Sequence, residues 1–247
     1  MSEQNKFGLD RYVPADIRRE VRRRCGFGCV ICGLSYYDYE HFAPDFSEAR
    51  EHDPEGMTLL CSQCNQKRAR KRLSAETVAR ANENPKCKQQ GFASETLDFG
   101  TSPMSVWFGT MCFVECDILI LVSGTSVLSV RPPEESGTPF LLSGQLTDCK
   151  GVVTLKIVDN VWSATDANWD VEVVGPKIVI RRGAGDIALQ IKMSPPHELF
   201  IEKIDMYING WHIRADEKGF RYSRDGLSWS GIGSGYMRGN PIGIQLG

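Results

Sequence analysis

The sequence predicts an α+β protein, with a small N-terminal domain over residues 1–88, a linker over residues 89–102 and an all-β C-terminal domain over residues 103–247. Helical patterns and two cysteine pairs lie in the first part. Short β-branched or aromatic runs separated by turn residues dominate the last part. The charge also changes sign: residues 1–90 carry 16 Lys and Arg against 13 Asp and Glu, whereas residues 91–247 carry 13 against 18.

The overall composition is that of a globular protein. Of the 247 residues, 41% are apolar and 24% are charged, which excludes a disordered chain and a coiled-coil rod. The longest apolar candidate, Asp117–Val130, is interrupted at Ser123–Gly124 and is too short for a membrane span of about 18 apolar residues. The polar, Arg-rich first 30 residues contain no apolar secretion signal. We therefore expect a cytoplasmic protein with no membrane partner.

The first predicted element is a helix over Asp16–Arg24. Pro14 precedes it, Asp16 is available to cap it, and Ile17 and Val21 fall on one face at i and i+4. The remaining surface is rich in arginine, which favours contacts with phosphates, although a solvated helix face is the alternative. The phosphate-contacting candidates are Arg18, Arg19, Arg22 and Arg23.

A short Gly-rich segment, Cys25–Cys32, follows and resembles a zinc knuckle rather than a helix or strand. A second helix is predicted to start at Cys61, run to about Arg72, and resume through Ser74–Asn82. The linker is placed where Pro and Gly occur among polar residues.

Six runs with period-two character predict strands in the C-terminal part: Val152–Val158, Trp169–Val174, Lys177–Arg182, Ile187–Met193, Leu199–Tyr207 and Trp211–Arg214. Asn209–Gly210 between the last two predicts a tight hairpin. Regular short strands of this kind indicate a sandwich- or solenoid-like domain. The Gly- and Ser-rich segment Lys218–Gly247 is expected to be an irregular extension outside the core.

Nine cysteines in a chain with no export signal favour metal binding over disulfides. Cys29 and Cys32 form one C-x-x-C pair, and Cys61 and Cys64 form a second one, with 28 residues between the two pairs. Each pair can occupy one edge of a tetrahedral thiolate site, and four thiolates leave no open position, so the site would be a structural zinc. Cys25 is an alternative ligand.

The interval between the pairs contains Tyr39-Glu40-His41-Phe42-Ala43-Pro44, and Asn65 follows the second pair. With the flanking cysteines, this order resembles the His-Asn-His (HNH) endonucleases of the ββα-metal type, over about residues 18–75. The resemblance implies a zinc-stabilised ββα-metal N-terminal domain that hydrolyses DNA. The C-terminal part resembles no family that we recognise.

The resemblance also implies roles for individual residues. His41 would be the general base that takes a proton from water. Glu40 and Asn65 would hold a catalytic divalent ion, Mg²⁺ or Mn²⁺, through oxygen atoms. Basic residues after Asn65 would contact the phosphates of DNA: Lys67, Arg68, Arg70 and Lys71.

Three positions depart from the family pattern. Glu40 stands where Asp is commoner, and Asn65 stands where the family's last His is commoner. Gly56 occupies the position of the middle Asn, and no Asn lies between His41 and Cys61. The missing side chain would brace the loop and orient His41, so the backbone or His52 would have to do this instead.

The acidic C-terminal part is expected to regulate, to recognise a ligand, protein or DNA base that acts as a trigger, or to form homo-oligomers. The family association implies a role in bacterial restriction or anti-phage defence. Two other functions remain open: a non-catalytic zinc module that binds nucleic acid, and an interaction or sensor protein that acts through the β domain. The sequence leaves open whether the substrate is DNA or RNA.

Overall fold

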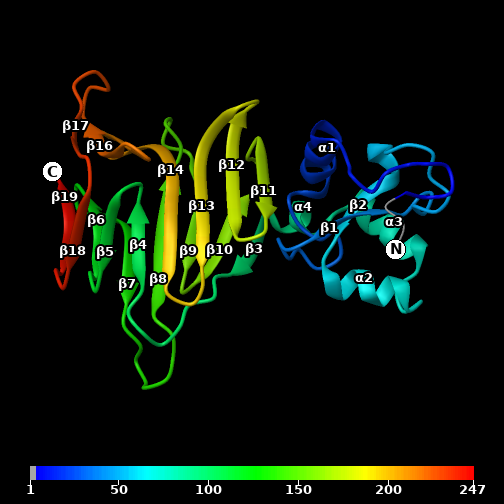
Figure 1. Cartoon of the computed structure of the whole chain (residues 1–247), viewed down its shortest axis with the longest axis horizontal. Coiled ribbons are helices and arrows are strands. Elements are labelled where there is room, and N and C mark those ends of the chain that lie inside the picture. Colours follow the sequence, from blue (N-terminus) through cyan, green and yellow to red (C-terminus); the bar gives the residue numbers. More distant parts are fainter. Residues whose placement is uncertain (1–3) are drawn as a thin grey trace. The chain divides into compact units, whose positions relative to one another are not determined.

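The computed structural model describes residues 4–247 and is mainly β-sheet with few helices (Figure 1). The chain forms two compact units. Unit 1 extends to Glu95 and includes the later segment Thr165–Glu172, whereas unit 2 contains Thr96–Ala164 and Val173–Gly247. Every helix in the described part of the chain is too short or too polar to serve as a membrane span.

Unit 1 carries the helices. They are α1 (Ala15–Cys25), α2 (Ser62–Ala69), α3 (Ala75–Glu83) and α4 (Lys86–Gln90), with a single 3₁₀ turn, η1 (Pro54–Gly56), and the strands β1 (Asp38–His41) and β2 (Met57–Leu60).

Helix α1 forms where it was predicted, because Val21 and Cys25 lie on the face that is buried in unit 1. Gly26 ends the helix in the left-handed conformation that glycine adopts without a steric penalty. The predicted cap at Asp16 is wrong, since Pro14 occupies the cap position and makes no side-chain capping bond. Ser74, where the second helical segment was predicted to resume, caps α3 through the Thr77 amide.

Strands β1 and β2 are antiparallel, with Glu40 opposite Thr58 and His41 opposite Met57. All four residues of β2 are buried, so the pair is fixed against the core of unit 1. Helix α2 begins directly after β2, because Cys61 is both the residue after the strand and the cap of the helix. Glu40 and His41 are therefore held at the end of β1, and α2 begins at the end of the neighbouring strand, β2.

The first half of the segment predicted as a linker, residues 89–102, has regular secondary structure. Helix α4 reaches Gln90, and β3 (Phe92–Thr96) follows it at once. Gly91 provides the left-handed residue between the two elements. The stretch is polar on average, but Cys87 and Ala93 are buried within unit 1, and that burial offsets the entropy of ordering it.

The chain enters unit 2 through β3. The strands that follow are β4 (Ser105–Phe108), β5 (Met111–Val114), β6 (Ile118–Val122), β7 (Thr125–Arg131), β8 (Leu141–Thr147), β9 (Val153–Val158), β10 (Val161–Thr165), β11 (Asp170–Val174), β12 (Lys177–Gly183), β13 (Asp186–Ser194), β14 (Glu198–Ile208), β15 (Trp211–Asp216), β16 (Gly219–Ser223), β17 (Ser230–Ile232), β18 (Gly235–Arg238) and β19 (Ile242–Leu246).

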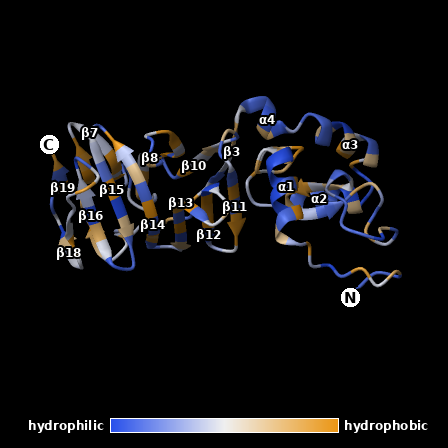
Figure 2. Cartoon of the chain, turned by 90° about the horizontal axis from the view of Figure 1, so that it is seen from above, coloured by the Kyte–Doolittle hydropathy of each residue, from blue (hydrophilic) through white to orange (hydrophobic). Residues whose placement is uncertain are grey.

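These strands form two sheets. One runs in the order β19-β6-β7-β8-β9-β10, and the other runs β12-β13-β14-β15-β16-β17. Strand β4 pairs in parallel with β14 and antiparallel with β5, which in turn pairs with β18. Alternation of apolar and polar residues along β13–β15 is visible in Figure 2 and matches the alternating burial of β14. Buried aromatic residues, among them Phe108, Phe113 and Phe220, fill the core of unit 2.

All six predicted strand runs are strands. The hairpin at Asn209–Gly210 is also confirmed, because both residues have positive φ (47° and 82°) and join β14 to β15. The expectation for Lys218–Gly247 is wrong. This segment contains β16–β19, and its Phe220, Ile244 and Leu246 are buried, so it completes both sheets.

Candidate functional site

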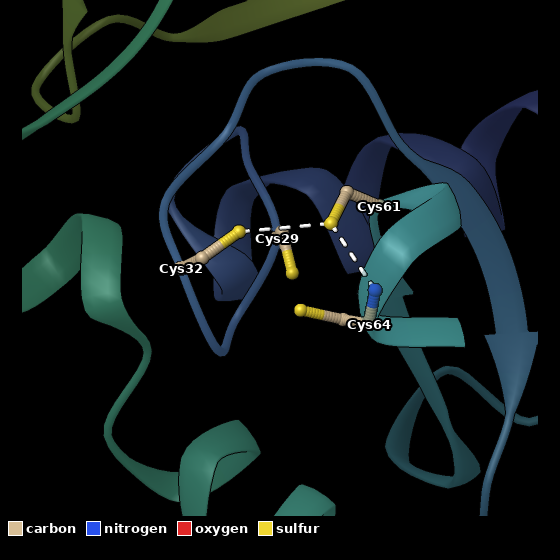
Figure 3. A group of neighbouring side chains, drawn as sticks. All are labelled: Cys29, Cys32, Cys61 and Cys64. Carbon is tan, nitrogen blue, oxygen red and sulfur yellow. Dashed lines mark hydrogen bonds between the residues drawn. The ribbon is translucent and has the colours of Figure 1, made fainter. Parts of the chain in front are cut away.

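The four cysteines of the two C-x-x-C pairs lie together in unit 1. In the first pair, the turn is closed by the Gly33 amide, which donates to the Cys29 carbonyl at 2.8 Å. In the second pair, the Cys64 amide donates to the Cys61 sulfur at 3.4 Å in the first turn of α2. Figure 3 shows the side chains of the knuckle and of α2 converging on one point.

The sulfur atoms fit a tetrahedral metal site. All four lie within 4.8 Å of one another, and Cys32 Sγ and Cys61 Sγ are 3.6 Å apart. Four ligands at the usual Zn–S distance would have sulfurs about 3.8 Å apart. The alternative ligand, Cys25, lies outside this group, and its sulfur faces Thr58 and Asn82. The cluster could therefore hold a metal ion such as zinc.

The pKa values of the clustered cysteines also favour a bound cation. The hydrogen bond with Cys32 lowers the pKa of Cys29 to about 5, so this thiol ionises readily. Burial, followed by the negative charge of Cys29, raises the pKa of Cys64 to about 12. Four thiolates cannot coexist here near neutral pH unless a cation offsets their repulsion, which is what a bound Zn²⁺ does.

Glu40 and Asn65, which the sequence predicts to share a divalent ion, are in direct contact. Asn65 Nδ2 donates to Glu40 Oε1 at 2.5 Å, which joins the end of β1 to the first turns of α2. Burial raises the pKa of Glu40, and the nearby Arg68 opposes that shift. An ion held by both residues would need the amide oxygen of Asn65 to face Glu40, which a 180° turn of the amide achieves.

His41 stands beside this pair and is largely buried, with 8% of its surface exposed. Burial, and then the charges of His52 and Arg11, lower its pKa to about 4. The imidazole of His41 is therefore neutral at pH 7, the form that accepts a proton. Its Nε2 lies 3.2 Å from Nδ1 of His52, a loop residue that sequence reasoning considered only as a substitute brace.

All three predicted catalytic side chains line one cleft of about 550 Å³. Its wall is completed by residues of the loop after β1 and of the segment from α2 to α3: Asp45, Phe46, Arg68, Ala69, Lys71, Leu73, Ser74 and Ala75. The cleft thus combines two carboxylates, an amide, a neutral imidazole and two cationic side chains.

Gly56, at the position of the missing Asn, braces the loop through its backbone. Its carbonyl accepts hydrogen bonds from the amides of Phe42 at 3.0 Å and Ala43 at 3.3 Å. A Cβ atom at position 56 would lie 2.3 Å from the Ala43 carbonyl oxygen, so a side chain does not fit. The backbone therefore fixes the start of the loop directly after His41.

The prediction that Arg22 contacts phosphates is contradicted, because this side chain is buried. Its guanidinium donates two hydrogen bonds to Asp170, both at 2.8 Å, and further ones to Glu172 at 3.0 Å and the Tyr39 hydroxyl at 2.7 Å. Sequence reasoning missed both acidic partners, since nothing local links positions 22 and 170. Arg22 anchors the segment Thr165–Glu172 within unit 1.

The other predicted phosphate contacts are at least partly exposed. Arg19 lies over the ring of Trp169 at 5.0 Å, Arg18 lies over Tyr12 at 5.5 Å, and Arg68 forms an ion pair with Asp45. The exposed members of the set are Arg23, Lys67, Arg70 and Lys71, of which Lys71 lines the cleft.

Replacing Arg22 by Ala is expected to destabilise unit 1 by about 3–5 kcal/mol, because the buried Asp170 would lose the guanidinium that donates two hydrogen bonds to it. Urea unfolding of the full chain measures this. The control is Arg23→Ala at the exposed neighbouring position, which should stay within about 0.5 kcal/mol of the parent. Equal stability of the two variants would show that Arg22 is no anchor.

Comparisons of the chain with protein-family models, with curated proteins and with solved structures give no match.

Proposed function

We propose that this protein is a metal-dependent endonuclease of the HNH, ββα-metal type that hydrolyses phosphodiester bonds of DNA. The observation that carries the proposal is the convergence of Glu40, His41 and Asn65 on one cleft. The antiparallel pair β1–β2 followed by α2 supports it, because this is the order of elements that the resemblance implies. The cysteine cluster supports a structural zinc in the same unit.

The side chains suit the reaction. Glu40 and Asn65 would hold a Mg²⁺ or Mn²⁺ ion, which supplies Lewis acidity to the phosphate and its leaving oxygen when bound. The neutral imidazole of His41 would take the proton of the attacking water. Lys71 adds positive charge along the cleft wall, where a phosphate would lie, and Arg68 beside it is paired with Asp45.

The zinc would play no part in the chemistry. Four sulfur ligands fill a tetrahedral shell, so no position stays open for water or substrate. Its place between the knuckle and α2 would fix the helix that carries Asn65. The protein would thus use two metals with separate tasks.

Exposed lysines on and after α2 are expected to bind the DNA backbone. The double variant Lys67→Ala with Lys71→Ala should weaken binding to all DNA sequences alike, and should reduce the slope of log affinity against log salt by roughly two. Fluorescence anisotropy with labelled DNA over a range of salt measures this slope. Lys150→Ala with Lys218→Ala, which removes the same charge from exposed positions of unit 2, should leave the slope unchanged.

Incubating the full chain with covalently closed circular DNA, with EDTA, Mg²⁺ or Mn²⁺, tests the proposed activity. Metal-dependent nicking supports an endonuclease. Binding without cleavage under every condition would instead support the non-catalytic zinc module. Absence of both binding and cleavage would favour an interaction or sensor protein that acts through unit 2.

Unit 2 is proposed to regulate the nuclease, to recognise a trigger or to mediate self-association. A role in restriction or anti-phage defence follows from the family resemblance.

A further inference from the structure

His52 contacts the imidazole of His41, and the proposed chemistry does not use it. Its Nδ1 lies 3.2 Å from His41 Nε2, and the two ring centres are 5.1 Å apart. This is hydrogen-bond distance for two ring nitrogens, one of which must donate and the other accept. The contact therefore couples the proton positions of the two rings.

The loop that carries His52 is held in place on both sides. Asn5 Nδ2 donates to the carbonyls of Phe46 at 2.6 Å and Ala49 at 2.7 Å, and Ala49 is buried. After His52, the Asp53 side chain accepts from the Glu55 amide at 3.0 Å and caps η1. His52 thus reaches His41 from an anchored segment.

The direction of the hydrogen bond follows from the proton transfer. When His41 has taken a proton, both of its ring nitrogens carry hydrogen, so Nε2–H can only donate to an unprotonated Nδ1 of His52. The opposite direction would place the proton of neutral His41 on Nδ1, and neither nitrogen would then be free for water. Only one arrangement leaves a ring nitrogen of His41 free to accept a proton.

We propose that His52 is a positioning residue: it accepts a hydrogen bond from His41 Nε2–H, and thereby leaves His41 Nδ1 as the atom that takes the proton from water. This inference rests on the proposed function. In this proposal His52 orients the ring of His41, and the Gly56 carbonyl holds the backbone of the loop that follows His41.

Two variants separate hydrogen bonding from packing. His52→Ala removes the acceptor and should lower kcat by roughly 10²-fold, because a small misplacement of a reacting group has an effect of that size. KM and zinc content should not change. His52→Asn offers an amide oxygen close to the position of Nδ1 and should restore most of the rate. Equal rates for His52→Ala and the parent would overturn the proposal.

A second measurement does not depend on cleavage. In the full chain with ¹⁵N-labelled histidine, NMR spectra of the ring nitrogens should show neutral His41 with its proton on Nε2. The His41→Ala variant identifies its signals. His52→Asn should keep this tautomer, and His52→Ala should give a mixture. A proton on Nδ1 of His41 in the parent would overturn the proposal. The expected tautomer in a parent protein that cuts no DNA would support the pairing and contradict only the proposed function.

Discussion

Replacing Cys61 by Ser is expected to unfold unit 1 of the protein. Cys61 supplies one of the four clustered sulfurs, so the change removes a metal ligand. A serine hydroxyl can still cap α2, so the loss would come from the metal site alone. Structural zinc sites contribute about 10–16 kcal/mol of binding free energy that is shared with folding, more than a domain of this size can lose. Metal analysis should give about one zinc per parent chain and none for the variant, with loss of the helical circular dichroism signal.

The matched control is Cys149→Ser, at a half-buried cysteine of unit 2 that lies outside the cluster. This variant should keep its zinc and its helical signal. A Cys61→Ser protein that is folded, or a folded parent without zinc, would contradict the structural role of the cluster.

Replacing His41 by Ala is expected to lower the cleavage rate by roughly 10²–10⁴-fold, the contribution of a well-placed general base. Zinc content and DNA affinity should remain near those of the parent, because His41 belongs neither to the cysteine cluster nor to the exposed basic set. Single-turnover cleavage of circular DNA at saturating protein measures the rate without the effect of binding.

Glu40→Ala should behave differently, since Glu40 would hold the metal rather than move a proton. Its activity should recover in part as the Mn²⁺ concentration rises, whereas that of His41→Ala should not. His197→Ala, at an exposed histidine of unit 2, controls for the loss of an imidazole. If His41→Ala cleaves as fast as the parent while EDTA abolishes cleavage, His41 is not the base.

Local signals in the sequence predicted much of the fold. Helix α1, the six strand runs and the Asn209–Gly210 hairpin depend on spacing and turn chemistry between near neighbours, which a sequence displays directly. The strands of Lys218–Gly247 escaped prediction because their Gly and Ser content suggests a loop. Strands β16 and β17 continue the sheet from β15, whereas β18 and β19 pair in parallel with β5 and β6, more than a hundred residues earlier.

The candidate site, too, was predictable only where its signals lie close together along the chain. The cysteine pairs and Glu40-His41 could be found from spacing and order along the chain. Arg22 was misassigned, because its place on an arginine-rich helix gives no sign of a partner at position 170. For the missing Asn, the sequence left the choice between the backbone and His52 open, since a backbone carbonyl such as that of Gly56 leaves no mark in a residue pattern.

The most direct test of the central claim is the rate at which the full chain nicks closed circular DNA as Mn²⁺ is added back after EDTA treatment, with bound zinc measured in the same samples. We predict a rate that rises from zero to saturation with Mn²⁺ while zinc stays at about one per chain. A rate that does not depend on Mn²⁺, or no nicking at any concentration of Mn²⁺ or Mg²⁺, would contradict the assignment of Glu40, His41 and Asn65 as a metal-dependent nuclease site.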